Sequence, residues 1–366
     1  GGDAKQTTAL NQPKALPLDA NGKGYCYLPA TTGNAPAVTF PTIGANDDFV
    51  LEMDVYLVDA AEFHIASAPT TASRFLVSGG AFYHGATNTS LTSSLSTGVS
   101  TLKIERASGT ITLKQNNELK ASAAFSSSVA LTYLSHNGQF SSTVPPLNGY
   151  IQKATLSIGG TEQLNVDFTA TNVRHGDTKF KCATGQVVTV NKSGNDPATI
   201  IKKSVLRFAN TGSTNISLRG LFANNINGGY MFAAFSVLGT GGESNGRAFT
   251  INQDANGDFQ LGGAIFGYHP SAGTLRVYAG GAIAEHTGLF DDSNRDILHE
   301  AKITNGNQLS KVNNADLGTT SITYVVNSNK FNIAANESDS RSFGENTAID
   351  LEYLALFPAT ITDAEA

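Results

Sequence analysis

Tryptophan is absent from the chain, and only two of its 366 residues are cysteine. Two cysteines cannot build the disulfide framework on which many small secreted folds depend, so the fold has to rest on buried apolar side chains. The absence of tryptophan also weakens the expectation of a sugar-binding face, because such faces commonly use aromatic rings that combine an apolar body with a polar edge.

Charge and long apolar runs are scarce as well. Charged residues make up 15% of the chain, against about 25% in an average protein, and the formal net charge is −6. The sequence has no cluster of lysine and arginine, which argues against a nucleic-acid partner. No run approaches the roughly 18 apolar residues of a membrane-spanning helix, so we expect no membrane insertion.

The chain is rich in residues that favour turns and strands. Its 37 glycines are about a tenth of the sequence, and no segment of ten or more residues shows a convincing helical period. This composition favours an all-β protein with many turns. At roughly 100–200 residues per domain, the length corresponds to two domains.

A strong strand signal is the run FVLEMDVYL. Its residues Phe49, Leu51, Met53, Val55 and Leu57 recur at every second position. Alternate side chains of an extended chain point to the same side, so this run predicts a strand with one buried face.

A meander of three strands is predicted further along. LKIER alternates up to a turn at Ser108–Gly109, TITLKQ alternates back to a turn at Asn116–Asn117, and ELKAS follows. Asn and Gly pairs of this kind are typical of tight hairpin turns.

The mid-chain stretch NVDFTATNVRHGDTKFKCATGQVVTVN, Asn165–Asn191, consists of short β-type runs joined by turns of Gly and Asp. Together with the FVLEMDVYL strand and the meander, it resembles the laminin-G-like (concanavalin A-like lectin/glucanase) jelly-roll domains of tailed-phage virion proteins. The resemblance implies two tandem antiparallel β-sandwich domains of this jelly-roll type, and it implies that Asn165–Asn191 closes the first of them.

The domain boundaries follow from this resemblance. We expect an extended N-terminal arm at 1–24, a first jelly roll at 25–207 and a second at 208–366. The arm either lies along a neighbouring subunit or is a tail of little consequence. The resemblance also places Cys26 and Cys182 in the first and last strands of one jelly roll, where both a disulfide and two buried thiols remain open.

The two halves of the chain echo each other, which predicts a duplication, although two all-β sequences can also match by coincidence. Asn116–Asn117 matches Asn313–Asn314, and GYIQKATLSI matches AIDLEYLALF at about the same spacing. Phe75 matches Phe249 at a shorter spacing. The difference predicts an added hairpin in the second half, in TLRVYAGGAIAEHTGLFDD.

One strand carries half of a hydrolytic motif. The glucanase branch of the resembling family uses carboxylates at alternate positions of a strand, and Glu52 and Asp54 fit the first part of that pattern. The further acid/base glutamate is missing, since Tyr56, Leu57 and Val58 follow. We therefore predict no catalytic residues, and we interpret the two carboxylates as outward polar groups of a half-buried strand.

A candidate metal site lies in the second half. Asp254, Asn256 and Asp258 offer oxygen ligands at alternate positions, which suits Ca²⁺, although Ile265 stands where an EF-hand would need glutamate. The alternative is a plain turn between two strands. Ca²⁺ is the one cofactor that the sequence suggests.

Two aromatic–histidine pairs are candidate ligand-binding residues, namely Tyr83–His84 and Tyr268–His269. Both pairs stand next to glycine or proline and look exposed. Tyrosine and histidine can stack on a sugar and bond its hydroxyls. The alternative is that they are structural residues of turns.

The resemblance predicts a non-enzymatic structural or interaction protein on the exterior of a phage virion, such as a tail, fibre or capsid-decoration component. Its partners would be other virion proteins and further copies of itself, and its location would be the virion or the extracellular space. The first alternative is a glycan-binding module that recognises host surface polysaccharide. A glycoside hydrolase ranks third, because its carboxylate motif is incomplete.

Overall fold

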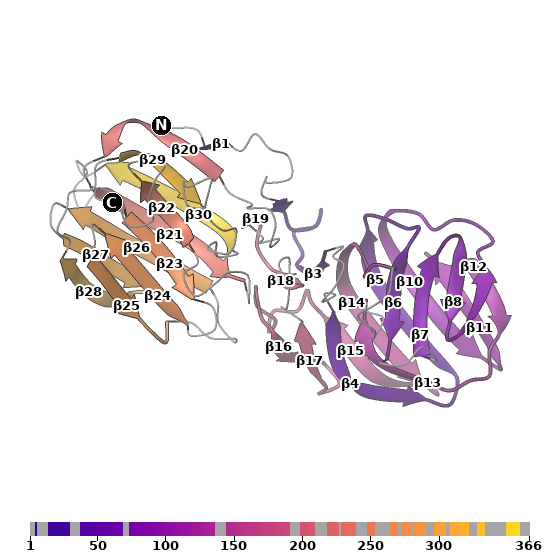
Figure 1. Cartoon of the computed structure of the whole chain (residues 1–366). Helices are drawn as coiled ribbons and strands as arrows, with labels where there is room; N and C mark the ends of the chain where they lie inside the picture. Colours follow the sequence, from indigo (N-terminus) through magenta and orange to yellow (C-terminus); the bar gives the residue numbers. More distant parts are fainter. Residues whose placement is uncertain are drawn as a thin grey trace. The chain divides into compact units, whose positions relative to one another are not determined.

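The structure is a computed structural model that describes residues 4–5, 14–29, 37–68, 73–135, 144–190, 198–208, 218–226, 228–238, 247–252, 264–269, 273–279, 282–289, 296–304, 307–321, 328–333 and 349–358. The elements in these ranges are β-strands, which confirms the predicted all-β class (Figure 1). None of the described elements is a helix that could span a membrane.

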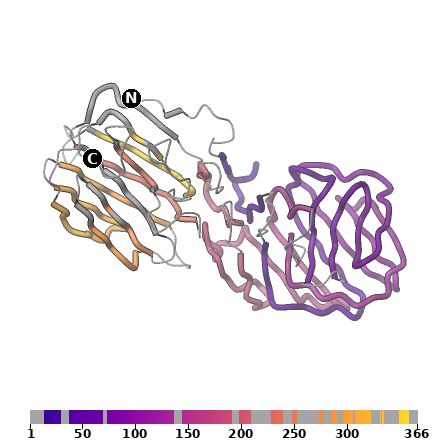
Figure 2. Tube along the Cα trace, in the orientation of Figure 1, coloured from indigo at the N-terminus to yellow at the C-terminus, as the bar shows by residue number. Residues whose placement is uncertain are grey.

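The chain divides into two compact domains. Leu18–Lys202 forms the first domain, and Gly1–Pro17 together with Lys203–Ala366 forms the second. Each domain contains two antiparallel sheets, which confirms the prediction of tandem β-sandwiches (Figures 1 and 2).

The first domain is built from two eight-stranded sheets. Sheet I has the order β12 (Glu118–Ala124), β11 (Thr110–Gln115), β10 (Gly98–Ala107), β5 (Phe49–Leu57), β14 (Gly149–Ile158), β3 (Tyr25–Leu28) and β18 (Thr199–Ile201), with β15 (Thr161–Asp167) also paired to β14. Sheet II has the order β16 (Lys179–Lys181), β17 (Val187–Val190), β4 (Val38–Ala45), β13 (Val129–Leu134), β6 (Phe63–Ser67), β7 (Arg74–Ser78), β8 (Ala81–His84) and β9 (Thr87–Ser90).

Strand β5 shows why the first domain folds in this way. Its alternate residues from Phe49 to Leu57 are all buried, as the sequence pattern predicts, whereas Glu52 and Tyr56 lie on the other face. The buried side chains meet those of sheet II, as in the contact between the rings of Phe49 and Phe75 at 6.0 Å between centroids. The core of the domain therefore lies between the inner faces of the two sheets.

The second domain repeats this plan in two seven-stranded sheets. Sheet III has the order β2 (Lys14–Leu16), β19 (Val205–Phe208), β30 (Ile349–Pro358), β21 (Gly229–Val237), β26 (Asp296–Thr304), β27 (Asn307–Val312) and β28 (Ala315–Ser321). Sheet IV has the order β1 (Ala4–Lys5), β20 (Leu218–Ile226), β29 (Ser328–Ile333), β22 (Arg247–Asn252), β23 (Ala264–His269), β24 (Thr274–Ala279) and β25 (Ala282–His286).

The two domains correspond strand by strand. In chain order, β3 to β14 of the first domain occupy the same sheet positions as β19 to β30 of the second. The equivalence extends to the turns: Asn116 and Asn117 have φ of 52° and 67°, and Asn313 and Asn314 have φ of 51° and 67°. The topology thus supports the predicted duplication.

Two details of the predicted repeat are wrong. Phe75 lies on β7 and Phe249 on β22, but the strand order makes β23 the equivalent of β7. The hairpin of β24 and β25, predicted as an addition, has its counterpart in β8 and β9. The matched runs share only a short stretch of consecutive buried residues, which does not fix the order of pairing in a sheet.

The predicted domain boundaries also need correction. Arg207, placed at the end of the first domain, lies within β19 of the second domain and is fully buried. Within the expected N-terminal arm, Ala4–Lys5 and Lys14–Leu16 are two edge strands of the second domain, β1 paired with β20 and β2 paired with β19, whereas residues 18–24 belong to the first domain. Edge pairing uses backbone groups, so a polar sequence gives little sign of it.

Candidate interaction surface

The structure separates the first predicted aromatic–histidine pair. Tyr83 and His84 are neighbours on β8, and the alternation of the strand leaves Tyr83 half-buried while His84 is buried. The imidazole lies within 3.1 Å of Thr89 Oγ1 and 2.9 Å of Thr87 Oγ1 and packs edge-on against Phe125. Burial lowers the pKa of His84. The predicted exposure of His84 is therefore wrong, because a strand directs adjacent side chains to opposite faces.

The second half of the chain holds the other predicted aromatic–histidine pair and the predicted calcium ligands. Tyr268 and His269 end β23, opposite Leu275 and Thr274 of β24. The predicted calcium ligands Asp254, Asn256 and Asp258 lie outside the described residues. Within the described ranges, no group of three or more His, Cys, Asp or Glu side chains could hold a metal ion.

The carboxylates of β5 lie on the outer face of sheet I. Glu52 is exposed, and Asp54 is half-buried and accepts a hydrogen bond from Thr101 Oγ1 at 2.9 Å. Across the strands, Glu52 is opposite Lys103 and Thr155, and Asp54 is opposite Lys153. These neighbours give the carboxylates cationic and hydroxyl partners on a solvent-facing sheet.

The two cysteines are free thiols in the structure. Cys26 lies on β3 of sheet I, whereas Cys182 follows β16 of sheet II and lies 3.2 Å from Thr184 Oγ1. Of the two arrangements left open by the sequence, the structure has buried thiols.

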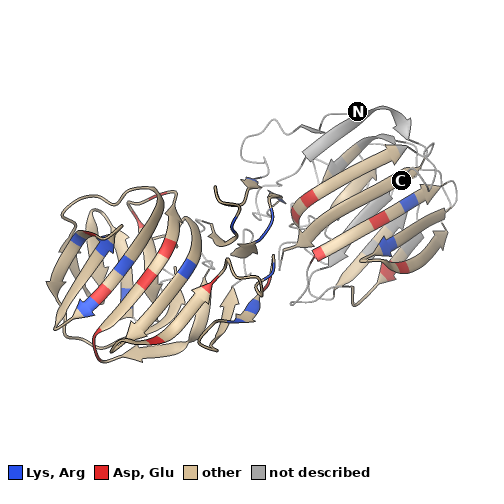
Figure 3. Ribbon diagram, turned by 180° about the vertical axis from the view of Figure 1, so that it is seen from behind, with Lys and Arg blue, Asp and Glu red and all other residues tan. Residues whose placement is uncertain are grey.

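The outer face of sheet I carries charged side chains of both signs (Figure 3). Glu105 Oε2 lies 3.0 Å from Lys114 Nζ and 3.5 Å from Lys103 Nζ, and the hydrogen bond from Lys114 lowers the pKa of Glu105 more than any other contact. Lys153 and Asp167 form a similar pair at 3.0 Å. Partly exposed pairs of this kind contribute at most about 1 kcal/mol each, so this face is a solvated surface.

One end of the sheet I face is aromatic. The rings of Tyr25, Tyr150 and Tyr56 stand in a row, with centroids 4.2 Å and 5.1 Å apart. Burial, Asp19 and Tyr56 together raise the pKa of Tyr150. Val99, 71% exposed, lies directly across from Tyr56 on β10. The row offers hydroxyl groups and ring edges beside an apolar side chain.

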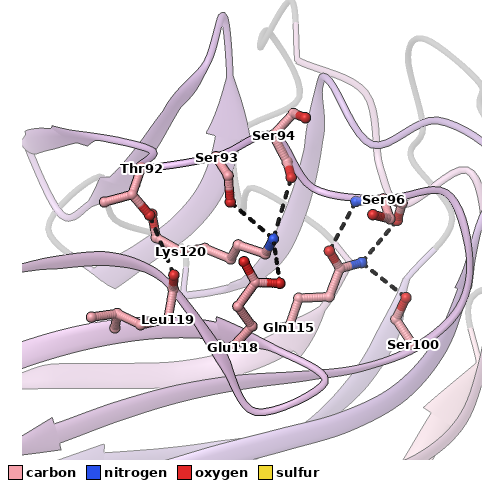
Figure 4. A network of polar contacts seen from close by, with 9 residues as sticks. All are labelled: Thr92, Ser93, Ser94, Ser96, Ser100, Gln115, Glu118, Leu119 and Lys120. Carbon is pink, nitrogen blue, oxygen red and sulfur yellow. Dashed lines mark hydrogen bonds and ion pairs between the residues drawn. The ribbon is translucent and has the colours of Figure 1, made fainter.

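A polar network fixes the segment that leads into this end of the sheet (Figure 4). The buried amide of Gln115 accepts a hydrogen bond from Ser96 N at 2.8 Å and donates to Ser96 O and Ser100 Oγ. Lys120, also buried, donates to Ser93 Oγ at 3.0 Å and pairs with Glu118. The segment from Ser93 to Ser96 is thus held by β11 and β12.

The outer face of sheet III is different, because aromatic rings gather on it. Tyr230 and Phe232 lie on β21 with ring centroids 6.4 Å apart and nearly parallel planes, and Phe357 of β30 packs edge-on against Phe232 at 6.0 Å. Lys302 Nζ of β26 lies 5.1 Å from the centre of the Tyr230 ring. Two neighbouring strands, β21 and β30, therefore bring their aromatic rings together, and β26 adds the ammonium group of Lys302.

The same face continues into exposed apolar side chains. Leu298 and Tyr353 flank Ala234 from β26 and β30 and are 40% and 55% exposed, and Leu309, opposite Lys302, is also exposed. We call this surface the sheet III face, and it consists of Tyr230, Phe232, Ala234, Leu298, Glu300, Lys302, Leu309, Lys311, Tyr353, Ala355 and Phe357. Exposed apolar side chains gathered on one face in this way are typical of an interaction site.

Charged groups border the sheet III face at one end. Lys203 Nζ lies 2.8 Å from Glu352 Oε2 and 3.4 Å from Asp296 Oδ1, and Ser236 donates to Asp296. Next to them, Arg207 and Asp350 form a buried two-point ion pair. An apolar centre with a polar border is the usual composition of a protein–protein interface.

Our sequence reasoning missed this face, although a signal was present. In the run GGYMFAAFSVLG, apolar residues occupy both sets of alternate positions, with Met231, Ala233 and Phe235 on one and Tyr230 and Phe232 on the other. A strand that is apolar on both sides indicates an outer face that is not merely solvated.

Comparisons with known proteins show only remote likenesses. No protein-family model matches the chain, and no curated protein matches it. Similar solved structures include domains LG4-5 of the mouse laminin alpha1 chain (TM-score 0.30, 9% identity, covering 97% of this chain and 99% of that one). A sialidase (TM-score 0.29, 11% identity, 84% of this chain) and the full extracellular region of zebrafish Gpr126/Adgrg6 (TM-score 0.29, 11% identity, 97% of this chain) are also similar. The chain spans 32% and 37% of the lengths of these last two. At such TM-scores we base neither the fold nor the function on these structures.

Proposed function

We propose that the chain is a non-enzymatic interaction protein whose second domain binds another protein through the sheet III face. The observation that carries the proposal is the group of aromatic and aliphatic side chains on the outer face of β30, β21, β26 and β27, which lies among the charged groups of Glu300, Lys302 and Lys311 and has ion pairs at one end. The exposed aliphatic groups Leu298 and Leu309 favour a protein partner over a sugar, because they offer no group that can bond a hydroxyl.

The setting that we propose is the exterior of a phage virion, with other virion proteins as partners. Its support is the resemblance of the FVLEMDVYL strand, the meander and the closing stretch to virion jelly rolls. A glycan-binding role remains the alternative, and it is favoured by the tyrosine row of the first domain, where Tyr56 and Tyr150 lie near Asp54 and Val99.

The experiment compares three binding partners. The full-length protein is sedimented with particles purified from its source, with intact bacterial cells, and with the isolated surface polysaccharide of those cells, each with and without Ca²⁺. We expect saturable binding to the particles, and we expect Tyr353→Ser combined with Leu298→Ser to reduce it at least tenfold. Leu119→Ser is the matched control, since Leu119 is 45% exposed on β12 of the first domain.

Each other outcome has a definite meaning. Saturable binding to the polysaccharide alone supports the glycan alternative, and loss of that binding on removal of Ca²⁺ would point to Asp254, Asn256 and Asp258. Unchanged particle binding in the double variant would contradict the sheet III face. Release of reducing sugars would contradict a non-enzymatic role, and Glu52→Gln then tests whether the β5 carboxylates perform the hydrolysis.

A further inference from the structure

Two equivalent strand positions are filled from different parts of the chain in the two domains. In the first domain, β17 pairs with β4 and β18 pairs with β3, and both strands follow the last long strand, β14; β18 is at the edge of sheet I, whereas β17 is flanked by β16. In the second domain, the equivalent places beside β20 and β19 are occupied by β1 and β2 from the N-terminal segment. This segment thus fills positions in the second domain that the first domain fills from its own later residues.

The register shows that these positions are equivalent. Lys14, Ala15 and Leu16 lie opposite Arg207, Leu206 and Val205. In the first domain, Thr199, Ile200 and Ile201 lie opposite Tyr27, Cys26 and Tyr25. The two sets of three pairs run in the same direction along the equivalent strands β19 and β3.

Burial shows that β2 is the more weakly held of the two. All three residues of β18 are buried, whereas in β2 only Leu16 is buried, at 8% exposure, and Lys14 and Ala15 are exposed. In β2, Leu16 is thus the one buried side chain, and the strand is joined to β19 by antiparallel pairing. These are the contacts by which an extended peptide adds to the edge of a sheet.

The position of β2 in the chain allows β2 of a second copy to take its place. The whole first domain, Leu18–Lys202, lies between β2 and β19 along the chain. The N-terminal segment of a second copy has the same backbone groups and the same Leu16, so it can pair with β19 in the same register. Exchange of an identical element between copies costs little, because each contact that is lost is formed again.

We propose that β2 (Lys14–Leu16) is a donor strand that is exchanged between copies of the chain, with β2 of one copy paired to β19 of another. Pro17 is the last residue before the first domain. The exchange uses no residue of the sheet III face, so the two proposals can fail separately.

A disulfide trap tests the exchange. Ala15 and Leu206 are directly opposed, at a separation that a disulfide between neighbouring strands can bridge. Full-length Ala15→Cys, labelled with ¹⁵N, is mixed with unlabelled Leu206→Cys, incubated and mildly oxidised. We expect covalent dimers whose linked peptides join residue 15 of the labelled chain to residue 206 of the unlabelled chain. Wild-type protein, with Cys26 and Cys182 buried, is the control for unspecific oxidation.

The double variant Ala15→Cys/Leu206→Cys carries both cysteines in one chain, so it reports the pairing of β2 with β19 of the same chain. If it forms only bonds within one chain over a hundredfold range of concentration, and the mixture forms no bond between residues 15 and 206, the proposal is wrong.

Light scattering measures the fraction of dimers and larger species without introduced cysteines. Leu16→Ser should lower the fraction of dimers and larger species severalfold, whereas Ala15→Ser, at an exposed position of the same strand, should not. Equal oligomer fractions in both variants would also overturn the proposal.

Discussion

Arg207 and Asp350 join the short strand β19 to the long last strand β30 of the second domain through a fully buried ion pair. Arg207 Nε lies 2.8 Å from Asp350 Oδ1, and Arg207 Nη2 lies 2.8 Å from Oδ2. The residues face each other in register on β19 and β30. Two parallel hydrogen bonds to one carboxylate fix both distance and orientation, so the pair holds β19 in this domain.

Removing one partner of this pair should be costly. We expect Asp350→Asn to lower the free energy of unfolding of the second domain by about 3–5 kcal/mol, because the Arg207 charge then stays buried without its counter-charge. Hydrogen exchange of the β19 and β30 amides, measured by mass spectrometry, resolves the effect from the first domain.

Two control variants test whether the loss of stability comes from the buried charge of Arg207 without its counter-charge. Asp167→Asn removes a partner of Lys153 at a partly exposed position and should cost less than about 1 kcal/mol. The apolar pair Arg207→Met/Asp350→Leu should recover much of the lost stability. A cost below 1 kcal/mol for Asp350→Asn would show that the pair contributes little.

The Gln115 amide should be important for the segment that it holds. We expect Gln115→Leu to cost about 1–3 kcal/mol in the first domain, since it removes the partners of both the N–H and the C=O of Ser96. Amide exchange should rise in the Ser93–Ser96 segment before it rises in β10.

The matched variant is Lys120→Met, which keeps the apolar stem but removes the ammonium group from Ser93 and Glu118. It should also loosen the segment, while the bonds of Gln115 to Ser96 and Ser100 remain. If neither variant changes exchange in the segment, the network of Figure 4 does not hold it.

The parts of the fold that follow from local patterns could be predicted from the sequence. Strand β5 has every second residue buried, and the β10–β11–β12 meander turns at Asn116 and Asn117, because alternation and left-handed turn residues are properties of short segments. The run ATIIKKSVLRF shows the limit of such patterns. It is one β-type stretch in the sequence, yet the domains divide it between Lys202 and Lys203. Only long-range pairing, with β3 on one side and β30 on the other, decides this division.

The surroundings of the candidate site residues were harder to predict from the sequence, because they depend even more strongly on pairing between distant strands. Gly85 after His84 suggested an exposed turn, but β8 places His84 among Phe82, Phe125 and two threonines. The sheet III face gathers Tyr230, Phe357 and Leu298 from three strands that are far apart in the chain. No spacing in the sequence brings them together, because antiparallel register between distant strands is set by the whole sheet.

The two Asn–Asn turns should respond equally to the same substitution. Asn116 Oδ1 accepts from Thr101 N at 2.9 Å, and Asn313 Oδ1 accepts from Leu298 N at 2.8 Å. We expect Asn116→Ala and Asn313→Ala each to cost about 1–2 kcal/mol in its own domain, from the lost hydrogen bond and from the left-handed φ. Urea unfolding followed by amide exchange in each domain measures both.

Glycine variants at the second residue of each turn test the left-handed conformation while the hydrogen bonds of Asn116 and Asn313 remain. Asn117→Gly and Asn314→Gly keep the left-handed conformation available and should be nearly neutral. A large cost at one turn and none at the other would argue that the two turns are not equivalent.

The second domain should lose stability in mild acid because of His299. This residue lies at a core position of β26, where burial first and the charge of His286 second lower its pKa from 6.5 to about 3. Between about pH 6.5 and pH 3, the His299 side chain is therefore protonated in the unfolded chain and neutral in the folded chain. The stabilisation is complete above pH 6.5 and is lost as the pH falls toward 3, by up to about 1.4 kcal/mol per pH unit.

The difference between wild type and His299→Leu isolates this effect from the titration of carboxylates. Between pH 7 and pH 5, the wild type should lose about 2 kcal/mol more than the variant in the unfolding free energy of the second domain. His286→Gln should reduce the loss slightly, since it removes the charge that disfavours protonation of His299. Parallel pH profiles for wild type and His299→Leu would mean that His299 is protonated equally in the folded and unfolded states, and that the acid sensitivity of the domain arises elsewhere.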